Sequence, residues 1–308
     1  MILYPNDPLA PRRIDPHFAD EAVAASARGL SVAVVDHDVI MTASGDALRS
    51  AVGTVPRGAD GRPTGAVYRG WMIPTPRYDA LAGALAERGV VLLTTPELYQ
   101  RAHELPGWYA ALVAWTPRSV WTVGTGAPEL EAARREVGPG PLVIRDYVKS
   151  MKHDWDEAAF VPASDDGVPL RRVAARFVEL RGEDLAGGLV LRDFEDLVGP
   201  EARTWWVDGS CVLVAAHPDT PGAVPDGVDV AEIASAVRSL GVRFVTVDVV
   251  RRADGAWRVM ELGDGQVSDR PSSVSPERFA ATVLCPVSDA ADAAASAASS
   301  HPVGRHDA

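Results

Sequence analysis

The pattern of hydrophobic and polar positions predicts alternating helices and strands over the N-terminal third of the chain. Apolar residues at helical spacing, each run closed by a glycine, predict helices over 18–29 and 78–89. Short apolar runs predict buried strands over 30–35, 66–73 and 90–94. This alternation indicates an N-terminal α/β lobe.

Two stretches interrupt that pattern. The first 17 residues contain four prolines and predict an irregular start. The segment 53–65, GTVPRGADGRPTG, is rich in turn-forming residues. We expect both to lie outside helices and strands.

Strands in hairpins become more frequent toward the C-terminus. We predict one or two short helices over 96–112, further helices over 128–138, 170–182 and 229–240, and strands over 141–148, 187–197 and 202–217. Asp208–Gly209, flanked by apolar residues, is a strong hairpin signal. A second hairpin is predicted from strands over 242–250 and 256–264, with its turn at Asp254–Gly255. The fold class is therefore α/β with an α+β C-terminal part.

Composition narrows the classes of function. The 308 residues are 47% hydrophobic and carry a net charge of −12, which argues against passive binding of nucleic acid. Only two cysteines are present, which argues against a disulfide framework. The N-terminus lacks the layout of a signal peptide, and no apolar run reaches the length of a membrane span. We expect a cytoplasmic protein that does not bind membranes.

Three segments are expected along the chain. Residues 1–125 are predicted to form the N-terminal lobe and residues 126–284 a second domain. Residues 285–308 include SDAADAAASAASSHPVGRHDA, whose low complexity predicts a disordered tail.

A basic cluster lies in VIRDYVKSMKHDW. If residues 142–148 form a strand, Arg145 and Lys149 lie on one face, and Lys152 follows in the next loop. Cations at a strand end suit a polyanion such as a triphosphate. A solvated basic loop is the alternative, and short basic clusters of that kind are common.

An acidic cluster lies in the second predicted hairpin. Its turn brings Asp248 and Glu261 near each other across the strands. Carboxylates in apolar strands need a positive partner, and magnesium bound to nucleotide phosphates is one. Alternatively, one carboxylate faces solvent or pairs with Arg203 or Arg258.

A third cluster covers GGLVLRDFEDL and PEARTWWVDGSCV. The first strand ends in acidic and aromatic residues, where backbone groups can meet an adenine edge and Glu195 can accept from ribose hydroxyls. Glu201 and Arg203 alternate along the next strand and share a face. Arg203 is then a candidate contact of the γ-phosphate or partner of a metal-binding carboxylate. A surface hairpin with an ion pair explains the same pattern.

Other conspicuous residues have simpler explanations. The seven histidines show no HxxxH spacing, so a zinc site is not expected. Trp205 and Trp206 are expected to pack in the core or at its rim. The sequence has neither a GxxxxGK[ST] phosphate loop nor a GxSxG elbow.

Taken together, the three clusters resemble the ATP-grasp superfamily, in particular its clade named for one arginine and two lysines. The resemblance is spread over residues 66–268. It is carried by AVYRGWMIPTPRYDAL, TTPELYQRAHELPGWYAAL, VIRDYVKSMKHDWDEAAFVP, LVLRDFEDL, PEARTWWVDG and FVTVDVVRRADGAWRVMELGDGQVS. It implies an ATP-grasp fold preceded by an α/β lobe, with ATP and Mg²⁺ bound in a cleft between the middle and C-terminal segments.

The resemblance also implies roles for individual residues. Phosphate contacts would be Arg145, Lys149 and Lys152, with Arg69 and Arg203 as further contacts of substrate or phosphate. The adenine hinge would be segment 192–195, with Asp193, Phe194 and Glu195, and Glu201 would also contact the nucleotide. The metal ligands would be Asp248, Glu261 and Asp264. Gly263 stands where many ATP-grasp enzymes have a metal-binding asparagine. The glycine-rich phosphate loop of other members is not evident, and DEAAFVPASDDG takes the place of a lid.

The implied reaction is ATP-dependent ligation of a carboxylate to an amine through an acylphosphate, with release of ADP. The partners would be small-molecule or peptide carboxylates and amines. A kinase on the same fold and an ATP-binding protein without turnover remain as alternatives, since a fold alone does not determine chemistry.

Overall fold

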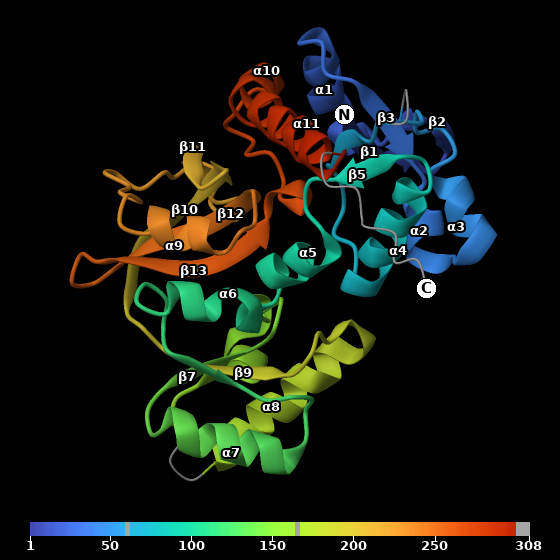
Figure 1. Cartoon of the computed structure of the whole chain (residues 1–308). Helices are drawn as coiled ribbons and strands as arrows, with labels where there is room; N and C mark the ends of the chain where they lie inside the picture. The colour runs from blue at the N-terminus through green and yellow to red at the C-terminus, as the bar shows by residue number, and fades with distance from the viewer. Residues whose placement is uncertain (59–61, 164–166, 300–308) are drawn as a thin grey trace, which may run out of the picture. The chain divides into compact units, whose positions relative to one another are not determined.

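The computed structural model describes residues 1–58, 62–163 and 167–299 (Figure 1). The chain forms two compact units. Unit 1 contains Met1–Ala102, Pro200–Asp248 and the residues from Gly263, whereas unit 2 contains His103–Gly199 and Val249–Leu262. These limits differ from the predicted segment boundaries after residues 125 and 284.

A parallel sheet forms the first part of unit 1. Its strands lie in the order β3-β1-β4-β5, and β2 pairs antiparallel with β1. The bounds are β1 Ile2–Asp7, β2 Ala10–Ile14, β3 Val32–Val35, β4 Thr64–Tyr68 and β5 Val90–Leu92. The prediction of an irregular start is therefore wrong. Pro5 pairs with Val35 at the end of the β1–β3 ladder, where a missing N–H is tolerated.

Side chains of this sheet alternate between two cores. Ile2 and Tyr4 of β1 belong to one core, whereas Leu3 belongs to the other. The first core also contains residues of α1 Pro16–Ala27, α10 Pro276–Phe279, the π-helix η5 Ala280–Leu284 and α11 Cys285–Ser299. The second contains residues of α2 His37–Thr42, α3 Gly45–Ala51, α4 Thr75–Ala86 and α5 Pro96–His103. Helices thus cover both faces, as an α/β lobe requires.

Helix α11 contradicts the predicted disordered tail over residues 285–299. Val287, Ala290, Ala291 and Ala295 repeat at helical spacing and are buried. The low complexity that suggested disorder consists mainly of alanine, which has the highest helix propensity. Its small side chains also let the helix approach β4 closely, since a Cβ on Gly65 would lie 2.2 Å from the Ala291 carbonyl oxygen. The rest of the predicted tail, residues 300–308, lies outside the described residues.

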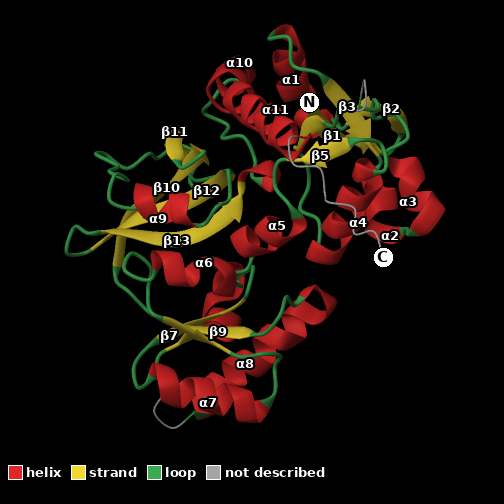
Figure 2. Cartoon of the chain, viewed as in Figure 1, coloured by secondary structure: helices red, strands yellow, loops and turns green. Residues whose placement is uncertain are grey.

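A second sheet has the strand order β11-β10-β12-β13 (Figure 2). Its bounds are β10 Leu197–Val207, β11 Ser210–Ala216, β12 Phe244–Arg252 and β13 Trp257–Asp264. The predicted hairpin turn is confirmed, because Asp208 and Gly209 have φ of 50° and 71°, as a type I′ turn requires. Helix α9 covers only Ala234–Ser239, so it is shorter than predicted.

Unit 2 is built on an antiparallel sheet of order β6-β9-β7-β8. Its bounds are β6 Ser119–Trp121, β7 Leu142–Asp146, β8 Phe160–Val161 and β9 Leu189–Asp193. Helices α7 Ala127–Val137 and α8 Val168–Arg181 pack on the face that carries Leu142, Ile144 and Leu191. Short helical segments are α6 Leu105–Leu112, η1 Lys152–Asp154, η2 Trp155–Ala159, η3 Gly182–Asp184 and, in unit 1, η4 Gly265–Val267. The predicted lid lies partly at 164–166, outside the described residues.

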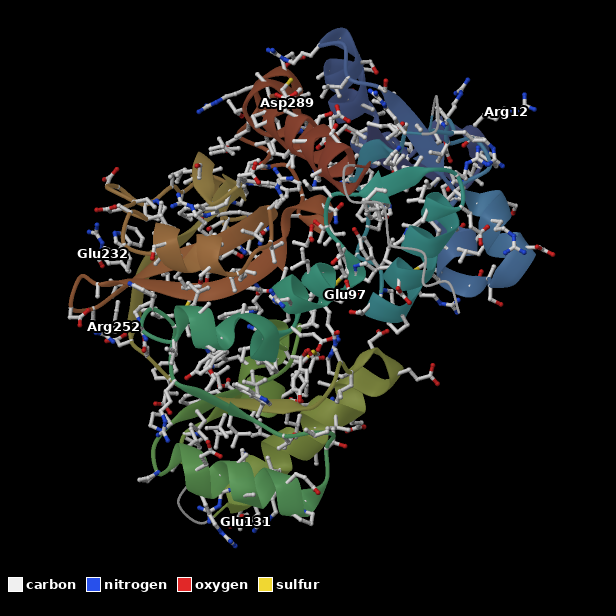
Figure 3. All side chains as sticks on the ribbon, viewed as in Figure 1. Arg12, Glu97, Glu131, Glu232, Arg252 and Asp289 are labelled. Carbon is white, nitrogen blue, oxygen red and sulfur yellow. The ribbon has the colours of Figure 1, made fainter. Side chains whose placement is uncertain are left out.

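Charged side chains are distributed over the surface of the molecule. Arg12, Glu97 and Glu232 are among the exposed ones (Figure 3). Among the described residues, no helix combines the length and the hydrophobicity needed to cross a membrane.

Candidate functional site

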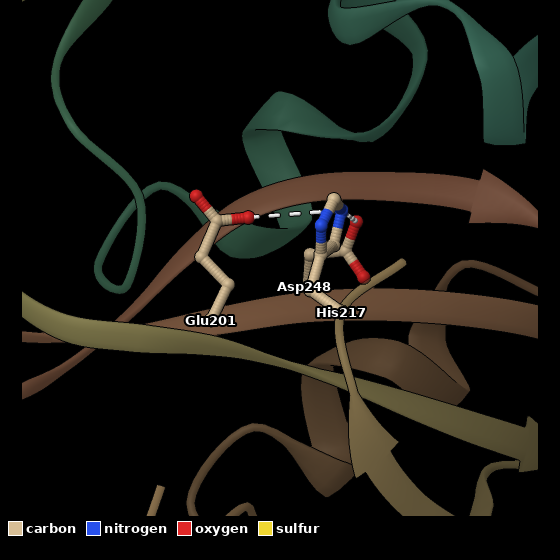
Figure 4. Close-up of side chains that lie close together, drawn as sticks. All are labelled: Glu201, His217 and Asp248. Atoms are coloured by element: carbon tan, nitrogen blue, oxygen red, sulfur yellow. Dashed lines mark ion pairs between the residues drawn. The ribbon is translucent and has the colours of Figure 1, made fainter. Parts of the chain in front are cut away.

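Four polar side chains gather on the second sheet within unit 1, and Figure 4 shows three of them, Glu201, His217 and Asp248. Glu201 and Arg203 lie on β10, Asp248 lies on β12, and His217 follows the last residue of β11. Glu201 and His217 are direct neighbours across the hairpin, because the His217 N–H donates to the Glu201 carbonyl at 3.2 Å. The sheet therefore brings together side chains that are far apart in the sequence.

Arg203 and Asp248 form a two-pronged ion pair. Arg203 donates from Nε to Oδ1 of Asp248 at 2.8 Å and from Nη2 to Oδ2 at 2.7 Å. Burial alone would raise the pKa of the Asp248 carboxyl. The hydrogen bonds and charge of Arg203, together with a hydrogen bond from His217, outweigh burial and lower that pKa below its ordinary value. Asp248 is thus held ionised inside the protein.

His217 is buried beside this pair. Its Nε2 lies 3.3 Å from Oδ2 of Asp248, 3.8 Å from Oε2 of Glu201 and 3.2 Å from Nη2 of Arg203. On the other side of the ring, the backbone N–H of Asp219 donates to Nδ1 at 3.2 Å. Oδ2 of Asp219 lies 3.7 Å from the same nitrogen.

The donor atoms of Glu201, His217 and Asp248 lie within 4.8 Å of one another. Two carboxylates in such proximity suit a hard divalent cation, which prefers carboxylate oxygens. The residues present therefore fit the magnesium implied by the family resemblance, with Asp248 and Glu201 as the oxygen donors of unit 1.

The search for histidine spacing missed His217. Val207 pairs with Ser210 and Trp206 with Cys211, but the register shifts at Trp205, which pairs with Leu213. This bulge moves His217 opposite Glu201, whereas a regular hairpin would place Ala216 there. The hairpin turn was readable from the sequence, but the bulge was not.

The basic cluster belongs to unit 2, where Asp146 organises it. Strand β7 ends at Asp146, whose Oδ1 accepts from the N–H groups of Val148 at 2.7 Å and Lys149 at 2.5 Å. Its Oδ2 accepts from Nε of Arg181 at 2.9 Å. The chain therefore turns before Lys149, so the predicted strand face shared by Arg145 and Lys149 is wrong. Lys149 and, in η1, Lys152 are exposed.

Arg145 is buried on the sheet face opposite the helices. Its Nη2 donates to the Val148 carbonyl at 2.7 Å and lies 3.9 Å from Oε1 of Glu261. Arg192 lies on the same face and donates to the Met260 carbonyl at 2.7 Å. Burial, together with the nearby charge of Arg145, lowers the pKa of Arg192 to about 9. Glu261, one of the two carboxylates predicted to hold the metal, thus lies beside cations in unit 2. The other, Asp248, belongs to unit 1.

The predicted adenine hinge, residues 192–195, begins in the last two residues of β9. Phe194 is 41% exposed, and its ring lies 5.2 Å from that of Phe160, which stacks on Trp155. Burial raises the pKa of Asp193, although the charge of Arg118 opposes that change.

Glu195 lies in an ion pair with Arg258. Both of its carboxylate oxygens accept from Arg258, each at 2.7 Å. Arg258 was an alternative partner for Asp248 or Glu261. In the structure it pairs with Glu195 instead. The ribose contact of Glu195 stays a prediction.

Arg69 has a structural role in place of the predicted substrate contact. It is 1% exposed, and its Nε and Nη2 each donate to Glu21 at 2.9 Å. Its Nη1 donates to the carbonyls of Gly265, Gln266 and Ser268. The guanidinium is thereby committed to holding the turn after β13.

Asp264 likewise differs from the predicted metal ligand. It is fully buried, and its Oδ1 accepts from the Gln266 N–H at 2.7 Å, which caps η4. Burial raises the pKa of Asp264 to about 7. A buried carboxyl with a raised pKa is a poorer ligand for magnesium than an accessible ionised one, and Asp264 lies in the core of unit 1.

The comparison with protein families identifies the central part of the chain. Residues 134–283 match the model of an ATP-grasp domain family, described as family 3 of the clade named for one arginine and two lysines. These residues form an ATP-grasp domain. The predicted family and the predicted fold class are therefore confirmed.

Solved structures support the ATP-grasp fold over almost the whole chain. The RimK domain protein ATP-grasp from Sphaerobacter thermophilus has a TM-score of 0.58 and 18% identity, covering 92% of this chain and 100% of that one. D-cycloserine synthetase DcsG has a TM-score of 0.56 and 17% identity, covering 94% and 98%.

The ATP-grasp ligase PsnB, complexed with minimal precursor, Mg and ADP, has a TM-score of 0.52 and 16% identity, covering 92% and 97%. No curated protein sequence matches the chain. At these identities the solved structures establish the ATP-grasp fold alone.

Proposed function

We propose that the protein is an ADP-forming ligase that activates a substrate carboxylate with Mg-ATP and joins it to an amine. The observation that carries this proposal is Asp248, a buried carboxylate held ionised beside Glu201 within an ATP-grasp domain. Ligases with this fold, among them PsnB and DcsG, support the class of reaction. The substrates would be small molecules or peptides.

Residues predicted from the sequence supply the proposed contacts of the nucleotide. In unit 2, Arg145, Lys149 and Lys152 are the proposed phosphate contacts, because cations favour a polyanion. Asp193 and Phe194 are proposed to meet the adenine, the former through its backbone and the latter through its partly exposed ring. In unit 1, Arg203 is the proposed contact of the γ-phosphate.

Asp248 and Glu201 are the proposed holders of Mg²⁺ in unit 1, and Glu261 keeps the metal-binding role that the family resemblance implies. Mg²⁺, when bound, would neutralise charge on the phosphate oxygens. The lysines then withdraw charge from the phosphoryl group as the substrate carboxylate attacks it. Preorganised charges of this kind are usually the largest catalytic contribution. The acylphosphate that forms is attacked by an amine, and phosphate leaves as the amide forms.

The proposal is tested by incubating the protein with ATP, Mg²⁺ and pools of amino acids or peptides. We expect ADP to appear together with a new amide, detected by mass spectrometry. Formation of ADP with a phosphorylated alcohol and no amide would support a kinase instead.

The variant Glu261→Gln provides a control for turnover. It keeps the shape of the side chain but removes a proposed metal-holding charge, so consumption of ATP should be lost. An ATP-binding protein without turnover would show no ADP release in either form.

A further inference from the structure

His37 lies at the carboxyl edge of the first sheet, beside the ends of three strands. It is the first residue of α2, which follows β3, and its backbone N–H donates to Oδ1 of Asn6 on β1 at 3.2 Å. Its Nδ1 lies 3.3 Å from the hydroxyl of Tyr68, the last residue of β4. Because β1 lies between β3 and β4, this contact spans the carboxyl end of the central strand.

This edge is where open α/β sheets bind their ligands. From β1 the chain proceeds to β3 on one side of β1 and then to β4 on the other. Helix α1 packs on one face of the sheet and α4 on the other, so the direction of winding reverses at β1. Ligands of such sheets bind outside the carboxyl ends of the strands at this reversal.

The hydrogen bonds of Tyr68 specify the tautomer of His37. The Tyr68 hydroxyl has one proton and donates it at 2.9 Å to the Trp71 carbonyl, which can only accept. Nδ1 of His37 therefore meets the Tyr68 oxygen as a donor. The lone pair of the neutral ring is then on Nε2, and within the described parts of the chain this nitrogen has no hydrogen-bond partner.

The surroundings of His37 combine an unprotonated base with negative charge. Burial lowers the pKa of the imidazole, so the ring is neutral at neutral pH and can accept a proton. Three nearby carboxylates, those of Asp38, Asp15 and Asp36, raise the same pKa by less. Carboxylates around a neutral acceptor favour a cation that donates hydrogen bonds, which is what an ammonium group provides.

Hydrogen bonds connect this edge to the strand of Asp248 within unit 1. Arg69, which follows Tyr68, donates to the Ser268 carbonyl at 2.8 Å. The Ser268 hydroxyl lies 2.8 Å from that of Thr246, two residues before Asp248 on β12. The edge of the first sheet is therefore joined to the strand that carries a proposed metal-holding carboxylate.

We propose that this carboxyl edge binds the amine substrate as its ammonium ion and that Nε2 of His37 accepts the proton whose loss makes the amine nucleophilic. This inference rests on the proposed ligase activity. The ammonium ion gives one proton to Nε2, which leaves a free amine and an imidazolium ion. The amine nitrogen attacks the acyl carbon of the acylphosphate, the C–N bond forms, and the C–O bond to phosphate breaks. The departing phosphate takes the second proton of the nitrogen, and the imidazolium returns its own proton to solvent.

Hydroxylamine separates this step from activation of the carboxylate. It is largely unprotonated at neutral pH, so it attacks an acylphosphate without a base and gives a hydroxamate. The full chain is incubated with ATP, Mg²⁺ and the pools of amino acids and peptides, with and without hydroxylamine. Mass spectrometry measures the rates at which amide and hydroxamate form.

In His37→Asn the amide N–H keeps the place of Nδ1 beside Tyr68, but the basic nitrogen is lost. We expect amide formation to fall about 100-fold, whereas hydroxamate formation should be unchanged. Thr42→Ala is the matched control on the same helix, because its hydroxyl donates to the Asp38 carbonyl, and both rates should match the wild type. If His37→Asn fails to fold, His37→Ala replaces it, and added imidazole should restore its amide formation.

Four results would overturn the inference. Undiminished amide formation in His37→Asn is one, and an equal fall in amide and hydroxamate is another, because the defect would then precede attack by the amine. A similar loss of amide in Thr42→Ala would attribute the effect to distortion of α2. Hydroxamate without any amide in the wild type would show that a carboxylate is activated but none of these amines is accepted. If the wild type forms neither product, the proposed ligase activity itself fails, and the inference fails with it.

Discussion

Arg203 donates two hydrogen bonds to one buried carboxylate, that of Asp248, at 2.8 and 2.7 Å. The pair joins two strands of one sheet and keeps the carboxylate ionised despite its burial. A buried charge that loses its partner is costly, so this pair links the stability of unit 1 to the proposed chemistry.

Arg203→Met should lower the free energy of unfolding by about 3–5 kcal/mol, because it leaves Asp248 buried without its cation. Because the pKa of Asp248 is lowered in the folded state, its ionised carboxylate stabilises the fold at pH values above the ordinary carboxyl pKa. This stabilisation is lost as the pH falls through the pKa that Asp248 has in the folded protein. The variant should therefore lose less stability than the wild type on acidification. Urea unfolding at several pH values measures both effects.

Two comparisons sharpen that experiment. Asp248→Asn added to Arg203→Met should recover part of the loss, since it removes the unpaired charge. Arg49→Met, which breaks an exposed pair with Asp46 on α3, should leave the urea midpoint unchanged. If Arg203→Met and Arg49→Met change the free energy of unfolding equally, the buried ion pair contributes no more to stability than the exposed one.

Arg69→Met tests the structural role assigned to Arg69. We expect a loss of about 3–5 kcal/mol in unfolding free energy, because Glu21 would be left buried without its cation. Where the variant is still folded, its affinity for an ATP analogue should match that of the wild type. A stable variant with impaired nucleotide binding would instead restore the original prediction of a phosphate contact.

The sequence was sufficient to predict most elements and the polar clusters. Alternating apolar residues and the Asp208–Gly209 turn predicted the hairpin of β10 and β11, because local residues determine such a turn. The exposed lysines 149 and 152 were also identifiable, since they follow a clear strand. Local chemistry of this kind is visible without a structure.

Features that depend on distant partners were not predictable. Arg69 appeared to be a functional cation until the structure placed Glu21, from helix α1, against it. The bulge at Trp205 that brings His217 to Glu201 has no local signal, and one residue of register reverses which side chains share a face. Burial and register, and not residue type, decided these cases.

Asp264→Asn should remove a pH dependence of stability. With a pKa raised to about 7 from an ordinary 3.8, the folded carboxyl keeps its proton over a range where the unfolded one is ionised. Stability contributed by this group therefore falls as pH rises from about 4 to 7, by about 1.4 kcal/mol per unit at most. Relative to the wild type, the variant should gain on the order of 3 kcal/mol across that range.

Unfolding by urea at pH values between 4 and 7 measures the difference. Asparagine keeps the oxygen that accepts from the Gln266 N–H, so the cap of η4 should survive. A constant difference between the two proteins across this range would show that Asp264 does not titrate there.

Gly65→Ala tests the docking of α11 on β4. The added Cβ would lie 2.2 Å from the Ala291 carbonyl oxygen, and backbone on both sides leaves little room to shift. Overpacking of this kind costs about 1–3 kcal/mol, so the thermal midpoint should fall. Gly83→Ala is the matched control, because no atom lies within 4 Å of its added Cβ and α4 should gain helix propensity, about 1 kcal/mol. If Gly65→Ala is as stable as the wild type, α11 does not pack against β4 in solution, and the alanine-rich segment returns to the disorder that its composition suggested.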